Sequence, residues 1–239
     1  MTYLSRIQTD STLLDRPIWG ALSTCLAPIS ESLGTARAFP RQFGPLAAVA
    51  SPDELSDFML LISQRKEPLL TFEVNTLMDQ RLCVPEDQVG GVQMIGHLPE
   101  RPKYSFKVEE LSDTHAKQIL ALAKRTRPGP FASQTHLLGD FIGIFEGSEL
   151  IAMAGQRLRI PGFTEISAVC VEQSYRGRGM GAELVRQMSK RILDSGHVPF
   201  LHAYESNAAA ISLYEGLGFK QRARLQVTSW VKNAAVQYG

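Results

Sequence analysis

The segment Tyr175-Arg-Gly-Arg-Gly-Met-Gly-Ala182 is the most informative stretch of this sequence. It holds three glycines within five positions, between a predicted strand and a predicted helix. Glycine allows a positive φ and lets a ligand approach the backbone where a Cβ would block it. The free N–H groups at a helix N-terminus attract phosphate, and Arg176 and Arg178 add charged donors. The segment therefore predicts a pyrophosphate site, with a purely structural tight turn as the alternative.

A nicotinamide cofactor is a competing interpretation of the same glycines. Gly177, Gly179 and Ala182 also match the dinucleotide pattern G-x-G-x-x-G/A. In that fold an acidic residue about 20 residues later ends the next strand. Here Asp194 falls at a predicted helix end, and the strand after it offers only Glu205. Too few strand and helix units remain for a doubly wound domain, so this alternative is disfavoured.

The segments around the glycine turn alternate between short strands and helices, which predicts an α/β or α+β layered domain. In the strand before the turn, Ile166, Ala168 and Cys170 are expected to share one face of the sheet. Strands are expected at 104–109, 141–145, 150–158, 165–171, 200–204 and within 219–231, and helices at 112–125, 180–194 and 208–217.

The first 98 residues are less sharply patterned. Ser51 can cap a helix and Glu54 can reach back to its start, which predicts a helix over 52–64. A short helix is expected from Pro17 to Leu26. Strands are expected at 46–50 and 69–72, and the pattern assigns little between 75 and 91.

Two prolines within residues 98–103 predict a linker. The chain is therefore expected to divide into an amino-terminal α/β region, residues 1–98, and a second domain, residues 104–239. No glycine-rich turn occurs in the first region, so one cofactor site per chain is expected. The loop over 127–131 and the amino-terminal region are the expected walls of a second substrate pocket.

Composition excludes several classes of protein. The chain has 239 residues, 44% of them hydrophobic, which suits one large or two small domains at roughly 150 residues each. With 25 basic and 24 acidic residues, the net charge of +1 gives no field for nucleic acid or an anionic membrane. No apolar run approaches about 18 residues, and no signal peptide is evident. We expect a cytoplasmic protein without nucleic-acid or membrane partners.

Cysteine and histidine spacing predicts neither a disulfide framework nor a metal site. Cys25, Cys83 and Cys170 are far apart and odd in number, which is typical of free thiols. The five histidines show no metal-ligand spacing, so no metal is expected. Cys170 should face away from Val169 and Val171, which argues against a nucleophilic role.

Two motifs in order resemble the GCN5-related N-acetyltransferase (GNAT) superfamily. Its acyl-CoA signature, Q/R-x-x-G-x-G/A, is matched by Arg176, Gly179 and Gly181. Its second motif, N-x-x-A-x-x-L-Y-x-x-x-G-F, is matched over Asn207–Phe219. The resemblance covers roughly 104–239 and is closest to the glycine N-acyltransferase-like branch, whose members carry an additional amino-terminal half. It implies the GNAT fold, a mixed and mostly antiparallel central sheet flanked by helices. Residues 1–98 would form the extra α/β half, for which a degenerate GNAT-like half-sheet is one arrangement.

The resemblance also implies a cofactor and its contacts. Acetyl-CoA, or another acyl-CoA, would be the cosubstrate, without a metal. The strand at Val169 and Val171 would pair with the pantetheine arm. Asn207 would contact the same arm, with capping of the next helix as an alternative or additional role. Backbone amides of the glycine turn would hold the pyrophosphate: Arg176, Gly177, Arg178, Gly179, Met180, Gly181 and Ala182.

Acyl transfer to an amine needs a neutral nucleophile, a polarised thioester carbonyl and a proton for the departing thiolate. By the resemblance, Glu165 is the candidate general base, directly or through water, with a solvated or ion-paired carboxylate as the alternative. Tyr214 is the candidate donor to the CoA sulfur, with plain packing as the alternative. A backbone N–H near Val169 is the implied oxyanion donor.

The sequence therefore indicates an acyl-CoA-dependent N-acyltransferase that moves an acetyl group to the primary amine of a small molecule or peptide. The alternative is a non-catalytic acyl-CoA sensor that uses its amino-terminal half as an interaction surface. The presence of both Tyr214 and Glu165 favours the enzyme. The acceptor, the acyl chain and the oligomeric state, a homodimer among the options, do not follow from the residues.

Overall fold

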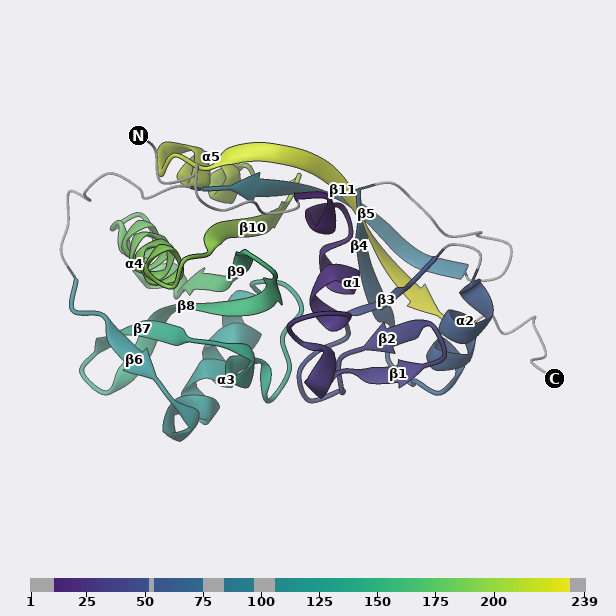
Figure 1. The fold of residues 1–239 in the computed structure, drawn as a ribbon. Coiled ribbons are helices and arrows are strands. Elements are labelled where there is room, and N and C mark those ends of the chain that lie inside the picture. Colours follow the sequence, from purple (N-terminus) through teal and green to yellow (C-terminus); the bar gives the residue numbers. More distant parts are fainter. Residues whose placement is uncertain (1–10, 52–53, 75–83, 97–105, 233–239) are drawn as a thin grey trace.

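The computed structural model describes residues 11–51, 54–74, 84–96 and 106–232 (Figure 1). Its amino-terminal part begins with a 3₁₀ helix, η2 (Ser11–Asp15), followed by α1 (Pro17–Leu22). Three short strands pair antiparallel in a small sheet: β1 (Glu31–Leu33), β2 (Ala36–Ala38) and β3 (Ala47–Val49). Then follow α2 (Leu55–Ser63), β4 (Leu69–Glu73) and β5 (Val84–Ile95).

The carboxy-terminal part carries the elements expected around the glycine turn. They are β6 (Glu109–Leu111), α3 (Ala116–Thr126), β7 (Phe141–Glu146), β8 (Glu149–Ile160), β9 (Phe163–Val171), α4 (Met180–Asp194), β10 (Val198–Tyr204), α5 (Ala208–Gly216) and β11 (Lys220–Val231). Residues 220–231 form one continuous strand with two irregularities in its register.

Within the described residues, eight strands form one sheet in the order β4-β11-β5-β10-β9-β8-β7-β6. All neighbours in it are antiparallel except β9 and β10. The expected fold class, a mixed and mostly antiparallel sheet flanked by helices, is confirmed.

The large sheet crosses the expected boundary between the two regions. β5 lies between β10 and β11 and pairs with both, and β4 pairs with the other edge of β11. Figure 1 shows β5 and β11 running together from α5 and β10 to β4 and α2. The proposed linker, residues 98–103, lies entirely outside the described residues. The division at 98–104 stays a prediction, but residues 104–239 alone would lack the strand that joins β10 to β11.

Helices cover both faces of the large sheet (Figure 1). On β8, Met153 belongs to the apolar cluster that contains Ile119 of α3. Its neighbours Ala152 and Ala154 belong to the cluster that contains Leu184 of α4. Because side chains alternate along a strand, α3 and α4 lie on opposite faces. None of the described helices combines the length and apolar character needed to cross a bilayer.

Helix α1 joins the amino-terminal part to the large sheet. It lies between β8 and the small sheet, as Figure 1 shows. Ile18 and Leu22 are buried in a cluster with Leu158 of β8 and Phe200 of β10. This packing buries apolar surface from both parts, so the two are stabilised together.

Several sequence expectations need correction. Of the strand expected at 104–109, residues 104 and 105 lie outside the described residues. Within the rest, β6 begins only at Glu109, and Phe106 and Val108 pack against the α4 side of the core. Of the helix expected at 52–64, residues 52 and 53 lie outside the described residues; within the rest, α2 begins at Leu55, and Glu54 makes no side-chain cap. The first helix ends at Leu22.

Strand β5 was not predicted. It contains Pro85 and a pair of glycines, which disfavour a strand locally. Pairing on both sides overrides that preference. A Cβ at Gly90 would meet the Glu205 carboxylate, but this is the end of a flexible side chain that can move aside, so space alone does not require glycine there.

Candidate active site

A cleft opens where the two parallel strands of the large sheet part. β9 and β10 pair from Phe163 and Val198 to Ile166 and Leu201 and no further. From there β9 continues along β8, whereas β10 continues along β5. A cleft of about 740 Å³ lies beyond this point. A crevice at the carboxyl ends of diverging parallel strands is a recurrent ligand site.

A β-bulge shapes the wall of the cleft in β9. Ala168 and Val169 lie opposite Ala154 alone, and Ala168 has a φ of 53°, which is uncommon without glycine. The extra residue reverses the alternation. Ile166 therefore packs on the same side as Val169, and not with Ala168 and Cys170 as expected.

The glycine turn lies at the mouth of this cleft, where α4 begins. Gly177 and Gly179 have φ values of 76° and 86°, a region that favours glycine. The first N–H groups of α4, from Met180 onward, have no carbonyl one turn earlier to accept them. A Cβ at Gly181 would meet Leu213 only at 3.5 Å, so protein packing alone does not require glycine there. These features fit a pyrophosphate group.

The two arginines of the turn also hold its shape. Arg176 donates from Nε to the Val171 carbonyl at 3.1 Å. Arg178 donates to the Ser174 carbonyl at 3.1 Å and stacks over the Tyr175 ring at 5.0 Å. Each guanidinium has further N–H groups that an anion could use.

Asn207 caps α5, as one of its expected roles required. Its Oδ1 accepts a hydrogen bond from the Ala210 N–H at 3.1 Å, and the residue also lines the cleft. Capping is therefore established, and contact with a ligand stays compatible with it.

Two further groups of the cleft wall keep their protons at neutral pH. Tyr214 is 7% exposed, and burial raises its pKa to about 12. Burial likewise raises the pKa of Cys170 to about 11. A neutral phenol can donate a proton, whereas a buried thiol is a poor nucleophile. The arrangement suits the expected donor role of Tyr214.

Glu165 lies behind the cleft wall and is 1% exposed. Arg157 donates to its two oxygens at 2.9 and 2.7 Å, His202 Nδ1 approaches at 2.7 Å, and the Leu158 N–H donates at 3.2 Å. Burial alone would raise its pKa, but the charge of Arg157 and the hydrogen bonds of His202 and Arg157 lower it to about 2. Glu165 is thus an ion-paired carboxylate, which was the alternative to a general base. Because donors occupy both of its oxygens, this geometry is unfavourable for Glu165 as a direct proton acceptor.

Two residues that reach both Glu165 and the cleft were missed from the sequence. Arg157 and His202 line the cleft and bind Glu165 at the same time. Arg157 reaches both Glu165 and the cleft because of a second bulge, in which Arg157 and Leu158 together lie opposite Glu165. Such a bulge leaves no sign in the hydrophobic pattern of β8.

The amino-terminal part also contributes to the wall. Phe72 of β4 lines the cleft, with its ring centroid 5.4 Å from that of His202 and 5.5 Å from the Arg157 guanidinium. Leu225 of β11 continues this apolar side. Residues 127–130 of the loop expected at 127–131 also line the cleft, and the part of this loop in an acceptor pocket stays a prediction. Phe72 could not be assigned from sequence because the place of β4 in the sheet depends on β11.

Comparison with known proteins agrees with this geometry. Residues 141–231 match the family model described as FR47-like protein. A crystal structure described as an acetyltransferase of the GNAT family, from Novosphingobium aromaticivorans, is 34% identical. The alignment covers 92% of this chain and 99% of that one, with a TM-score of 0.83. A GCN5-related N-acetyltransferase from Kribbella flavida, 13% identical over 89% of this chain and 94% of that one, shares the fold with a TM-score of 0.60.

Two curated relatives match a shorter segment. The N-alpha-acetyltransferase RimI of Mycobacterium tuberculosis is 36% identical over 86 residues, 34% of this chain and 52% of the relative. The N-alpha-acetyltransferase MAK3 of Arabidopsis thaliana is 36% identical over 80 residues, 33% of this chain and 41% of the relative. The chain thus spans about half the length of the curated relatives it matches. Its place in the glycine N-acyltransferase-like branch stays a prediction.

Proposed function

This chain belongs to the GCN5-related N-acetyltransferase family, and we propose that it transfers an acetyl group from acetyl-CoA directly to a primary amine. The observation that carries the proposal is the glycine turn at the start of α4, with two positive φ values, beside the cleft between β9 and β10. An anion site and a crevice between diverging strands together suit a long phosphorylated thioester.

In this proposal the backbone amides of residues 176–182 hold the pyrophosphate. The edge of β9 at Val169 and Val171 pairs with the pantetheine arm, and Asn207 contacts that arm while capping α5. Acetyl-CoA supplies the activated acyl group. The residues of the chain orient it, admit the amine and supply the proton.

The chemistry needs no covalent intermediate on the protein. The neutral amine nitrogen forms a bond to the acetyl carbon as the carbon–sulfur bond breaks, and the proton that the nitrogen loses passes to water in the cleft and replaces the one that Tyr214 gives up. The bulge at Ala168 and Val169 supports the Val169 N–H as donor to the oxyanion, because two residues of β9 there share one partner in β8. Tyr214, whose pKa of about 12 keeps it protonated, gives its proton to the departing thiolate.

The role proposed for Glu165 is not that of a direct general base. Both of its oxygens are engaged and it does not line the cleft. It holds Arg157 and His202, which do line the cleft, in fixed orientations. Glu165 is therefore proposed as a positioning residue.

The first acceptor to test is the α-amino group of a peptide. Both curated relatives are named for N-alpha-acetylation, and each matches about a third of this chain. Small primary amines form the second class to test, and Phe72 and the loop over 127–130 are among the residues that line the cleft they would enter.

The test begins with calorimetric titration of the full chain with acetyl-CoA and, separately, with NAD. Thiol release from acetyl-CoA is then measured with peptides that offer only an α-amine, with peptides that offer only a lysine side chain, and with small amines. Binding of acetyl-CoA and release of CoA with one class support the proposal. Binding without release across the panel indicates an acyl-CoA sensor, and binding of NAD alone, or of neither, contradicts the proposal.

A further inference from the structure

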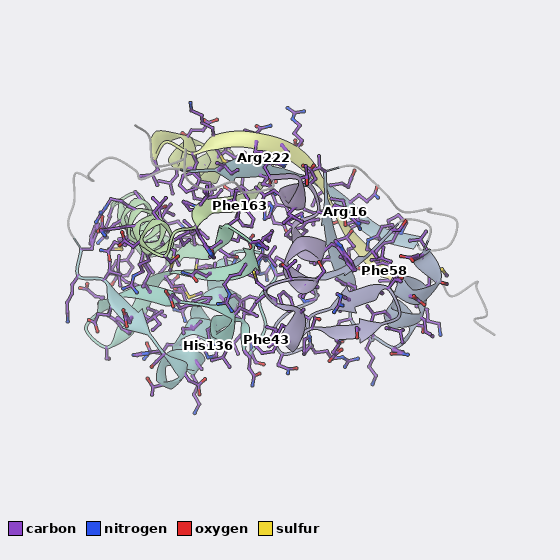
Figure 2. The ribbon with its side chains drawn as sticks, in the orientation of Figure 1. Arg16, Phe43, Phe58, His136, Phe163 and Arg222 are labelled. Carbon is purple, nitrogen blue, oxygen red and sulfur yellow. The ribbon has the colours of Figure 1, made fainter. Side chains whose placement is uncertain are left out.

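A chain of hydrogen bonds runs from the amino-terminal part of the molecule to the cleft. It starts at Asp15, the last residue of η2, and it passes through Arg222 of β11, which is labelled in Figure 2. The successive contacts are Arg222 to Asp15 at 2.6 Å, Arg222 to Gln93 at 3.0 Å, Gln93 to His202 at 3.1 Å, His202 to Glu165 at 2.7 Å and Arg157 to Glu165 at 2.7 Å.

The orientation of the Gln93 amide is fixed from two sides. Arg222 Nη1 donates to Gln93 Oε1, so this atom is the carbonyl oxygen. Gln93 Nε2 donates to the Leu14 carbonyl at 2.8 Å, so this atom is the amide nitrogen. Gln93 is fully buried and presents its other N–H to His202.

This arrangement decides the tautomer of His202. Its Nε2 faces an amide N–H and must accept, so the ring proton is on Nδ1, which donates to Glu165. The charged groups in this chain of contacts are Glu165 of β9, Arg157 of β8, Arg222 of β11 and Asp15 of η2.

Two β-bulges bring the side chains of this hydrogen-bond network together. In β11, Gln221 lies opposite Met94 and Ala223 opposite Gln93, so Arg222 is the extra residue. In β8, the bulge described above places Arg157 opposite Glu165. Bulges re-aim side chains and occur next to active sites, so two on one network indicate a function beyond packing.

The network ends at a charged group on the cleft wall. Arg157 uses Nε and Nη2 on Glu165. Within the described residues Nη1 has no hydrogen-bond partner, and Arg157 lines the cleft. The network thus fixes a guanidinium whose remaining N–H groups are available to a bound molecule.

We propose that Gln93 and His202 are positioning residues for acetyl transfer, which act through Glu165 to hold the Arg157 guanidinium at the wall of the cleft. This inference rests on the proposed function. Under this proposal the amino-terminal part is a component of the active site through Leu14, Asp15 and Gln93, although the glycine turn belongs to the carboxy-terminal part.

The first readout is the tautomer of His202, measured by ¹⁵N NMR of the imidazole in the full chain. The imidazole signal of His202 is identified by its absence in His202→Asn. It is expected to show a proton on Nδ1 and none on Nε2 at neutral pH. A proton on Nε2 would overturn the inference. This measurement needs no turnover, so its failure is distinct from failure of the proposed function, which would appear as no CoA release with any amine.

The second readout separates turnover from cofactor binding. Gln93→Leu is expected to lower kcat about tenfold, since a hydrogen bond within a charged network is lost, and to leave the acetyl-CoA Kd unchanged. Gln88→Leu makes the same change at an exposed position of β5 and is the matched control. An unchanged kcat in Gln93→Leu, or an equal fall in Gln88→Leu, would overturn the inference.

Conservative variants separate positioning from folding. Gln93→Glu keeps the volume and the acceptor for Arg222, but its carboxylate cannot donate to His202, so kcat is expected to fall about tenfold, as in Gln93→Leu. His202→Asn retains an N–H for Glu165 and is expected to keep kcat within about threefold, whereas His202→Leu loses about tenfold. A kcat of Gln93→Glu equal to that of the parent, or equal losses in the two His202 variants, would contradict the proposal.

Discussion

Glu165 in the cleft region and Glu73 in the amino-terminal region are both buried against an arginine, and the two carboxyl groups hold protons very differently. Glu165 receives hydrogen bonds on both oxygens, and its pKa lies at about 2. Glu73 of β4 is 4% exposed, accepts from Arg16 at 3.0 Å on one oxygen, and has its other oxygen buried without a partner among the described residues. Burial raises its pKa to about 7, although Arg16 opposes the shift.

The difference shows that the number of donors, more than burial, decides the charge of a buried carboxyl group. At the cleft, a bulge brings both the Arg157 side chain and the Leu158 N–H to Glu165. Arg16, labelled in Figure 2, divides its N–H groups between Glu73 and the carbonyls of Val49 and Ala50. The cleft region is built to hold a charge, whereas the amino-terminal region uses its arginine to join segments of chain.

The largest expected effect is on acetyl-CoA binding, and a matched control separates it from the effect of strain in the backbone of α4. Gly179→Glu should weaken acetyl-CoA binding by about a hundredfold or more, because it places a carboxylate where the phosphates belong. Gly196→Glu is the matched control, since Gly196 ends the same helix with a φ of 81° and open space around it. Both variants strain the backbone, but only Gly179→Glu should raise the Kd measured by calorimetry. An equal loss in the control would contradict the phosphate site.

Glu165→Gln tests the cleft side of the comparison. It leaves Arg157 without its charge partner and should cost about 3 kcal/mol of unfolding free energy at pH 7. Since the pKa of Glu165 falls from 4.5 to about 2 on folding, the stabilisation is complete above pH 4.5 and is lost as the pH falls toward 2. Urea unfolding should therefore show a cost that shrinks from pH 5 to pH 3, and a constant cost would contradict the assigned charge.

Tyr214→Phe tests the chemistry inside the cleft. It removes only the hydroxyl, so kcat should fall roughly tenfold to a hundredfold while the acetyl-CoA Kd stays the same. Steady-state kinetics and calorimetry on the same preparation give both values. A kcat equal to that of the parent would remove the donor role and leave Tyr214 a packing residue.

Glu73→Gln has the smallest expected effect and the opposite pH dependence. Gln resembles the neutral form that burial favours, so the variant should lie within about 1 kcal/mol of the parent at pH 7. Since the pKa of Glu73 rises from 4.5 to about 7 on folding, the parent loses stability as the pH rises through this range. In urea unfolding, the loss of unfolding free energy caused by Glu73→Gln should therefore become smaller as the pH rises. A loss that became larger would contradict the raised pKa of Glu73 and the contrast with Glu165.

The sequence predicted the elements whose signals are local. The turn before α4, the Asn207 cap and the hairpin of β7 and β8 depend on residues within a few positions of one another. Glycine conformations and caps act over that range, so they can be found in the sequence. The candidate donor Tyr214 belongs to the same class, since a short motif carries it.

The partners of Glu165 could not be predicted in this way. His202 is 37 residues from Glu165 and 109 from Gln93, and they meet only because β10 lies between β9 and β5. The bulges that aim Arg157 and Arg222 depend on strand register, which leaves no periodic signal.

The sequence by itself determined the glycine turn before α4, the family and the alternation of strands and helices, because backbone propensity and short motifs act locally. Only the tertiary structure decided that β5 completes the sheet, that Phe72 lines the cleft and that Glu165 is a held charge. These features depend on pairing between distant segments, and the free energy of a buried charge depends on all the donors around it.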